Sequence, residues 1–230
     1  MEALPVIIIG GLVFLPVLGV VAYLFLRGRR RLAALRRRLG GARPASTGRL
    51  GEGLVAILGR CQAKELLEAP FSGVQVCGYR VRVVELQGQM TTTGIAREKV
   101  VMDTTRVADL VLQDNDGEVR IDGKDAVLLG ADALYGDTGL LQGGPPEKVT
   151  SYLAAYGHFG APGMGLGRKL CWYEYRLAPG DTVLVVGAWT GEALGAPVGE
   201  KLILADRDLG ALLGALDELD LPPELIRKEE

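Results

Sequence analysis

RKLCWYEYRLAPGDTVLVVGAW, residues 168–189, is the stretch that decides the fold. Residues 168–177 and 182–189 are rich in β-branched and aromatic side chains, and the Ala-Pro-Gly-Asp between them is typical of a tight turn. We therefore expect two strands joined by that turn. The second, TVLVVGAW, is apolar at odd and even positions alike, which predicts a central strand buried on both faces.

Short apolar runs separated by turn residues continue on either side of this stretch and predict a mainly β domain, an antiparallel barrel. In one run the alternation slips at Gly78, where we expect a β-bulge. Asp116-Gly117 supplies the turn of a hairpin. The candidate strands are 54–58, 74–83, 99–102, 110–112, 118–121, 126–129 and 201–204.

Two short helices are expected beside this sheet. Residues 147–156 follow Pro145 and Pro146 and end before Gly157, which suits a helix C-terminus. Leucines recur at helical spacing over 209–219, with acidic residues off the stripe. The fold class is thus mainly β with one or two short helices, plus the N-terminal segment considered next.

Residues 4–26, LPVIIIGGLVFLPVLGVVAYLFL, carry no charged side chain. A helix of this length spans about 34 Å, enough for a hydrocarbon core of about 30 Å. A cleaved signal peptide would need basic residues before the apolar run and a small-residue cleavage site after it, whereas here the basic residues follow. The positive-inside rule then places the rest of the chain in the cytoplasm of a bacterium or archaeon.

Seven arginines follow the apolar run, and we expect them to determine the topology and to contact anionic headgroups. They are Arg27, Arg29, Arg30, Arg31, Arg36, Arg37 and Arg38. Residues 40–53 are rich in Gly, Pro, Ala, Ser and Thr, which is typical of a flexible linker. The expected division is therefore a transmembrane anchor (1–27), a basic juxtamembrane segment and linker (28–53), a β domain (54–221) and a charged tail (222–230).

Charge and cysteine content exclude several classes of function. Residues 1–43 hold eight arginines and one glutamate, which leaves 18 basic against 27 acidic residues, a net charge of −9, in the remainder. An acidic domain is poorly suited to nucleic acid. Cys61, Cys77 and Cys171 form no CxxC pair, so neither a disulfide scaffold nor a zinc site is expected, and we predict no metal and no cofactor.

Two stretches resemble catalytic or metal-binding motifs without meeting their requirements. DNDGEV (114–119) lacks the EF-hand spacing and its glutamate, so we interpret it as a turn. The glycine-rich residues 157–167 resemble a phosphate loop, but no Ser or Thr follows the lysine; we expect a mobile loop, in which His158 is the chain's single histidine. No nucleophile-base pair stands out, because Ser72 and Asp181 are turn residues.

Three stretches, in this order, resemble the GIDE domain, also called BAM for "beside a membrane": APFSGxxxCxY (69–79), LVLQDNDGEVRID (110–122) and YEYRLAPGDTVLVVG (173–187). The domain occurs in membrane-anchored RING ubiquitin ligases of the mitochondrial outer membrane and in many prokaryotic proteins. The motif positions, which we expect to be structural, are Pro70, Ser72, Gly73, Cys77, Tyr79, Asp114, Gly117, Glu174, Gly180, Asp181 and Gly187.

The resemblance implies a membrane-proximal, substrate-engaging domain without its ligase. A RING binds two zinc ions through eight Cys or His ligands, and this chain has three cysteines and one histidine. We expect a single-pass membrane protein whose domain binds a partner protein or ligand at the bilayer surface. The alternatives are a degenerate or partner-dependent ubiquitin-protein transferase, a hydrolase built on the glycine-rich loop, and a self-associating membrane scaffold.

Overall fold

A computed structural model describes residues 32–87, 97–130, 133–137, 145–157, 169–216, 221 and 225, and this part of the chain is mainly β. Its strands are β1 (Arg43–Pro44), β2 (Leu54–Ala63), β3 (Leu67–Glu68), β4 (Gln75–Val76), β5 (Gly78–Gln87), β6 (Arg97–Val107), β7 (Leu110–Gln113), β8 (Glu118–Ile121), β9 (Ala126–Leu129), β10 (Ala133–Asp137), β11 (Lys169–Leu177), β12 (Thr182–Trp189), β13 (Leu194–Gly195) and β14 (Leu202–Ala205). The helices are residues 32–40, α2 (Glu147–Ala155) and α3 (Leu209–Ala215).

Five strands close into a barrel in the order β2-β7-β8-β13-β12, and β12 pairs back onto β2 over seven residue pairs. All neighbours in this ring are antiparallel except β8 and β13, which are parallel. If the five barrel strands are numbered 1 to 5 by their order in the chain, their order around the ring is 1-2-3-5-4. This is the connectivity of an OB-type Greek-key barrel. The expected barrel is present, with one parallel contact that the sequence did not indicate.

Strand β12 is buried on both faces, as its apolar pattern predicts. Val183 and Val185 are fully buried among the side chains that fill the barrel. Leu184 and Val186 point the other way, into a second cluster that includes Leu35, Leu39 and Leu212 of the two outer helices. Hydrophobic layers therefore lie on both sides of the barrel wall, and β12 is common to both.

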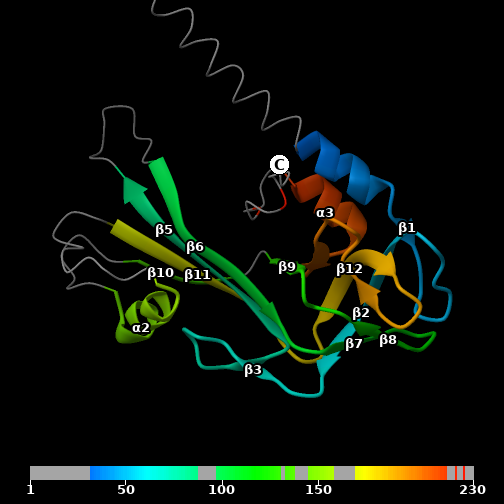
Figure 1. Ribbon diagram of the computed structural model, residues 1–230, viewed down its shortest axis with the longest axis horizontal. Coiled ribbons are helices and arrows are strands. Elements are labelled where there is room, and N and C mark those ends of the chain that lie inside the picture. Colours follow the sequence, from blue (N-terminus) through cyan, green and yellow to red (C-terminus); the bar gives the residue numbers. More distant parts are fainter. Residues whose placement is uncertain are drawn as a thin grey trace, which may run out of the picture.

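The sequence did not indicate the second sheet, in the order β10-β11-β5-β6. It extends to one side of the barrel, and α2 covers one of its faces (Figure 1). Val149 and Leu153 of α2 pack there against Trp172. The expected bulge at Gly78 is wrong, because Gly78 pairs regularly with residues on β6 and β11; the irregularity lies between Val83 and Val84.

The basic juxtamembrane segment and the expected flexible linker (40–53) are both packed on the barrel where the structure describes them: in the linker, Ala42 is buried and Ala45 and Leu50 lie against the barrel core. Helix 32–40 lies beside α3 (Figure 1), and its Leu35 and Leu39 are buried. β1 pairs in parallel with β2. Leu32, Leu35 and Leu39 recur at helical spacing between the arginines, and this apolar stripe packs in the outer hydrophobic layer.

The expected anchor, residues 1–27, lies outside the described residues. Within the ranges that the structure does describe, no helix has the length and apolar character needed to cross a bilayer.

Candidate functional site

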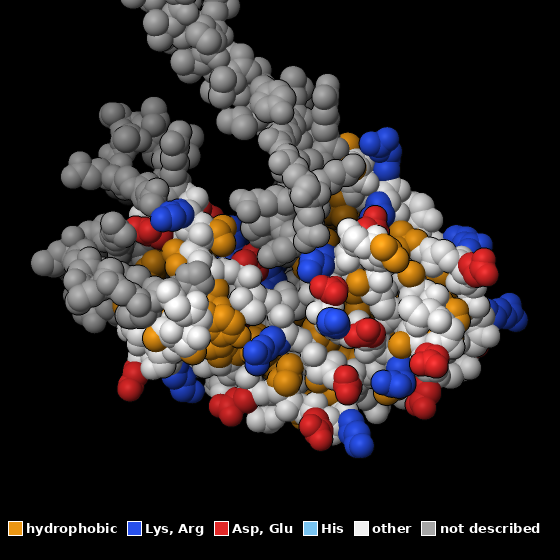
Figure 2. Space-filling view, viewed as in Figure 1, with side chains coloured by type: hydrophobic (Ala, Val, Ile, Leu, Met, Phe, Trp, Pro, Cys, Tyr) orange, Lys and Arg blue, Asp and Glu red, His pale blue; other side chains and the backbone are white. Residues whose placement is uncertain are grey.

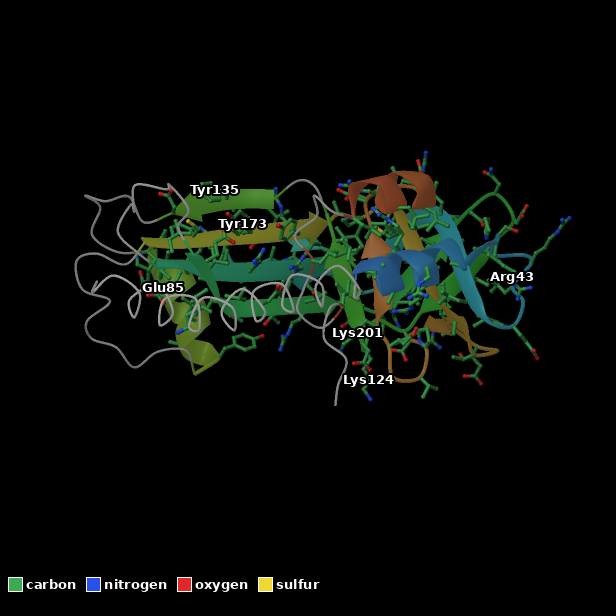
Figure 3. The ribbon with its side chains drawn as sticks, turned by 90° about the horizontal axis from the view of Figure 1, so that it is seen from above. Arg43, Glu85, Lys124, Tyr135, Tyr173 and Lys201 are labelled. Atoms are coloured by element: carbon green, nitrogen blue, oxygen red, sulfur yellow. The ribbon has the colours of Figure 1, made fainter. Side chains whose placement is uncertain are left out.

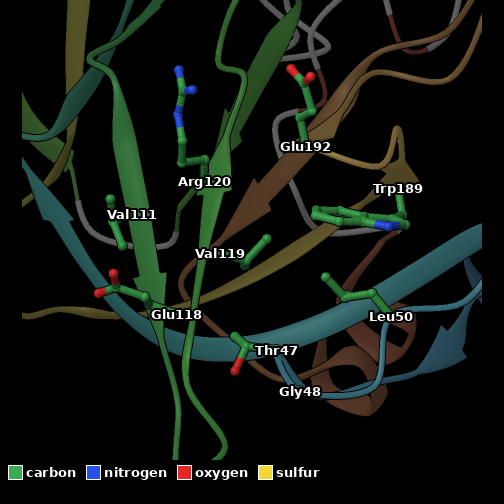
Figure 4. Close-up of a pocket in the computed structure, with 9 residues that line it drawn as sticks. All are labelled: Thr47, Gly48, Leu50, Val111, Glu118, Val119, Arg120, Trp189 and Glu192. Atoms are coloured by element: carbon green, nitrogen blue, oxygen red, sulfur yellow. The ribbon is translucent and has the colours of Figure 1, made fainter.

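A groove of about 440 Å³ opens in the barrel wall beside β8 (Figure 4). Three separate stretches of the chain meet there: the loop after β1, the β7–β8 hairpin, and the end of β12 with the turn that follows it. The lining residues are Thr47, Gly48, Leu50, Val111, Glu118, Val119, Arg120, Trp189 and Glu192. The groove therefore depends on closure of the barrel and on the docking of the N-terminal loop.

The groove exists because the barrel is poorly closed at this seam. All four residues of β8 pair with β7, but among the residues that the structure describes only Ile121 pairs with β13. Strand β13 is two residues long and continues no further along β8. The edge of β8 at residues 118–120 is therefore left without a neighbouring strand of the barrel.

Apolar side chains form the floor of the groove. Trp189 is half-buried and its ring extends toward Val119, with Leu50 nearby (Figure 4). Both Trp189 and Leu50 pack at the margin of the barrel core, and Val119 is 4% exposed. The indole thus has one side supported by the protein and the other available to a ligand, an arrangement that suits stacking or a cation–π contact.

The rim is charged and mostly acidic. Glu118, Arg120 and Glu192 are all exposed, giving two carboxylates against one guanidinium. Glu192 lies on a tight turn, in which the Thr190 hydroxyl donates to the Ala193 carbonyl at 2.9 Å and Gly191 takes φ +96°. The turn keeps Glu192 beside the same groove as Trp189, three residues earlier in the chain.

Asp114 fixes the loop that forms one side of the groove. Its carboxylate accepts hydrogen bonds from the Thr47 backbone N–H at 2.8 Å and the Thr47 hydroxyl at 2.5 Å, and from the backbone N–H of Asp116 at 2.8 Å. Partial burial acts to raise the pKa of Asp114, but these hydrogen bonds outweigh it and lower the pKa. Asp114 thus ties the 46–50 loop to the β7–β8 hairpin.

A second hollow of about 410 Å³ lies on the other side of that loop. Leu58, which is 45% exposed, and Leu209 contribute apolar surface, and Asp114 and Asp116 contribute carboxylates. It is lined by Pro44, Ala45, Ser46, Ala56, Leu58, Asp114, Asn115, Asp116, Leu184 and Leu209. It offers no aromatic side chain and no basic group, so the groove beside β8 is the more versatile of the two.

Glu174 brings two of the family-like stretches together. It is fully buried, and its carboxylate accepts the backbone N–H of Phe71 at 2.6 Å and, more weakly, that of Ser72 at 3.3 Å. Gly73, with φ +73°, completes the turn, which begins at Pro70. These residues hold backbone in place and none of them lines the groove.

Most of the other motif positions also serve local geometry. Asp181 accepts the Ala178 N–H at 2.7 Å and Gly180 takes φ +88° in the β11–β12 turn, while Gly117, with φ +150°, closes the β7–β8 hairpin. A Cβ at Gly187 would come within 2.6 Å of the Gly195 carbonyl oxygen. Tyr79 is buried beneath α2.

Cys61 and Cys77 face each other in the barrel core, and both are free thiols. Burial, with the neighbouring Cys77 thiol, raises the pKa of Cys61 to about 12, and burial also raises the pKa of Cys77. Cys171, the third, is 4% exposed and is also free. The Cys61 and Cys77 thiols are therefore poor nucleophiles at neutral pH.

The sheet carries a polar cluster on the face opposite α2. Arg80 and Asp103 form a bidentate ion pair at 2.7 and 2.8 Å, with side-chain exposures of 1% and 5%. The Arg80 guanidinium lies 5.3 Å from the ring centroid of Tyr175, which belongs to the barrel core. Tyr135 and Tyr173 lie on neighbouring strands with their rings 5.3 Å apart (Figure 3). The ion pair joins β5 to β6 within the sheet, and the Arg80–Tyr175 contact lies next to the barrel core.

Of the seven arginines expected at the membrane, the structure describes three. Arg38 pairs with Glu200 at 2.7 Å and donates to the Lys201 carbonyl at 3.0 Å, so it contacts the barrel. Arg36 and Arg37 are exposed on helix 32–40. Arg27, Arg29, Arg30 and Arg31 lie outside the described residues, as do His158 and the glycine-rich residues up to 168.

Acidic and basic side chains alternate over the face of the barrel seen in Figure 2, without a broad basic patch. Within the described part of the chain, no three His, Cys, Asp or Glu side chains are grouped so that they could hold a metal ion. The chain matches no known family model, no curated protein and no solved structure.

Proposed function

We propose that this chain is a membrane-anchored binding module whose GIDE-like β domain captures a partner protein at the bilayer surface through the groove beside β8. The observation that carries the proposal is the groove itself. It combines an accessible indole, Trp189, with apolar walls and a charged rim, which are the features of protein recognition sites.

The barrel connectivity supports the same location. OB-type barrels bind ligands on their second and third strands and on the loops that border them. Here those strands are β7 and β8, and the bordering turn between β12 and β13 carries Glu192. This is an analogy of fold, and the choice of ligand depends on the side chains. The acidic rim, with the net charge of −9 after residue 43, disfavours nucleic acid.

The packed N-terminal segment supports a role beside a membrane. Helix 32–40 is fixed on the barrel by its buried leucines and by the Arg38–Glu200 ion pair. A domain joined to an anchor by a packed helix presents its groove in a preferred orientation, which a flexible linker would not impose. Arg36 and Arg37 remain exposed on that helix to attract anionic headgroups.

The buried thiols argue against the transferase alternative in its thioester form. A transferase that forms a thioester needs an accessible thiolate. Cys61, Cys77 and Cys171 are at most 4% exposed. A ubiquitin-transfer assay with the full chain should therefore yield no product unless a separate ligase is added.

Site-specific photocrosslinking of the full chain in its native membrane tests the proposal. A benzophenone amino acid at position 111, in the groove, should form a discrete adduct that is lost in the Trp189→Ala variant. The same group at position 198, which is fully exposed and outside the groove, is the matched control. Equal adducts from both positions, or a position-111 adduct that Trp189→Ala leaves unchanged, would contradict the proposal.

A further inference from the structure

We infer that the groove binds an extended basic peptide segment as an additional β-strand on the free edge of β8. This inference rests on the proposed function and names the chemistry of the partner that the groove accepts. It follows from the direction of the backbone groups of β8, from the space beside them and from the charges on the rim.

The hydrogen-bonding phase of the β7–β8 hairpin determines which backbone groups point outward. The Asp114 N–H donates to the Gly117 carbonyl at 3.0 Å, so these two residues form a hydrogen-bonded pair. Hydrogen-bonded pairs alternate along an antiparallel ladder, so Val119 and Ile121 direct their N–H and C=O toward β7. Glu118, Arg120 and Asp122 therefore direct theirs away from β7.

One contact on the opposite edge agrees with this phase. The Asp122 N–H donates to the Leu194 carbonyl of β13 at 2.9 Å, which shows that the even-numbered residues point across the seam. Strand β13 meets β8 only at Ile121 within the described residues. The backbone groups of Glu118 and the N–H of Arg120 thus face the groove, where an extended chain about 4.8 Å away could pair with them.

The side chains around this edge select the residues of such a strand. A peptide residue on the inner face would lie over Val119 and against Trp189 and Leu50, so an apolar side chain is favoured there. A residue on the outer face would lie near Glu118, with Glu192 across the groove, so lysine or arginine is favoured. Alternating apolar and basic residues meet both requirements.

Net charge favours the same partner over an anionic one. The rim has two carboxylates against one guanidinium, and the chain after residue 43 has a net charge of −9. The negative field of the domain therefore accelerates the approach of a basic segment and repels phosphates. An oligonucleotide, the ligand of many OB-type barrels, is the alternative that the test excludes.

The probe is an acetylated, amidated octapeptide of alternating valine and lysine, added to the full chain in a neutral detergent. The chain has two tryptophans, so Trp172→Phe leaves Trp189 as the single fluorescent reporter in the groove. We expect saturable quenching or a spectral shift of Trp189 with this peptide. The matching valine–glutamate octapeptide and oligo-dT should produce neither.

Variants and backbone methylation separate the two parts of the inference. Replacing both rim carboxylates, Glu118→Gln with Glu192→Gln, should weaken binding by about fivefold. Glu65→Gln, at an exposed position outside the groove, should leave binding unchanged. N-methylation of one alternate set of peptide residues should abolish binding while methylation of the other is tolerated, because only one set directs its N–H toward β8. The lysine set is sensitive in an antiparallel strand and the valine set in a parallel one.

Binding that tolerates methylation of both sets equally would overturn the strand model. Stronger binding of the glutamate peptide or of oligo-dT would overturn the assignment of a basic partner. If neither octapeptide binds while the Trp189-dependent adduct from position 111 persists, this inference fails and the proposed function stands. If that adduct is also absent, the proposed function fails as well.

Discussion

Leu184→Asp tests whether the barrel wall is buried on both sides. Leu184 is 2% exposed and packs outside the barrel, against the layer that helix 32–40 and α3 provide. Losing this apolar side chain costs about 2 to 3 kcal/mol of burial energy, and placing a carboxyl in its apolar site costs several kcal/mol more. The sum, about 5 kcal/mol or more, is comparable with the whole stability of a domain.

Leu58→Asp is the matched control, because Leu58 pairs directly with Leu184 across the β2–β12 ladder and yet is 45% exposed. It should cost at most about 1 kcal/mol. Pulse proteolysis of the full chain in detergent, over a urea series, measures both variants. Val185→Asp, on the barrel-interior face, should behave like Leu184→Asp. If Leu184→Asp retains the midpoint of the unsubstituted chain, the outer layer does not cover β12 and the account of the fold is wrong.

Three further predictions follow from individual contacts. Glu174→Gln replaces the buried carboxyl group whose oxygen accepts the Phe71 N–H and should cost about 2 kcal/mol in urea unfolding; an unchanged midpoint would show that the contact is dispensable. The hydrogen bonds that Asp114 accepts lower its pKa in the folded state. They therefore stabilise the fold at pH values above the ordinary Asp pKa, and this stabilisation is lost as the pH falls through the lowered pKa of the folded state. Asp114→Asn should therefore show a shallower loss of melting temperature on acidification, and an identical pH profile would refute this role. Val198→Cys, fully exposed, should react with a membrane-impermeant maleimide only after cell lysis, against a background of three buried native thiols; labelling of intact cells would reverse the predicted topology.

The sequence by itself determined the local elements. Alternating apolar residues around Asp116-Gly117 specify the β7–β8 hairpin, and the apolar run of residues 182–189 specifies a strand with both faces buried. Pro146 and Gly157 bracket α2 within a residue or two of its observed ends. These signals are local because turn chemistry and side-chain periodicity depend only on near neighbours.

Only the tertiary structure decided the partners of those elements. The parallel contact between Ile121 and Leu194 leaves the edge of β8 open, and no sequence pattern in either segment predicts that pairing. Glu174 meets Phe71 across 103 residues of sequence. The groove takes Thr47, Val119 and Trp189 from segments that are each unremarkable alone, because a binding surface arises where the closed barrel brings distant chain together. Helix 32–40 shows the same limit: its arginines indicated a membrane, while its leucines belong to the barrel.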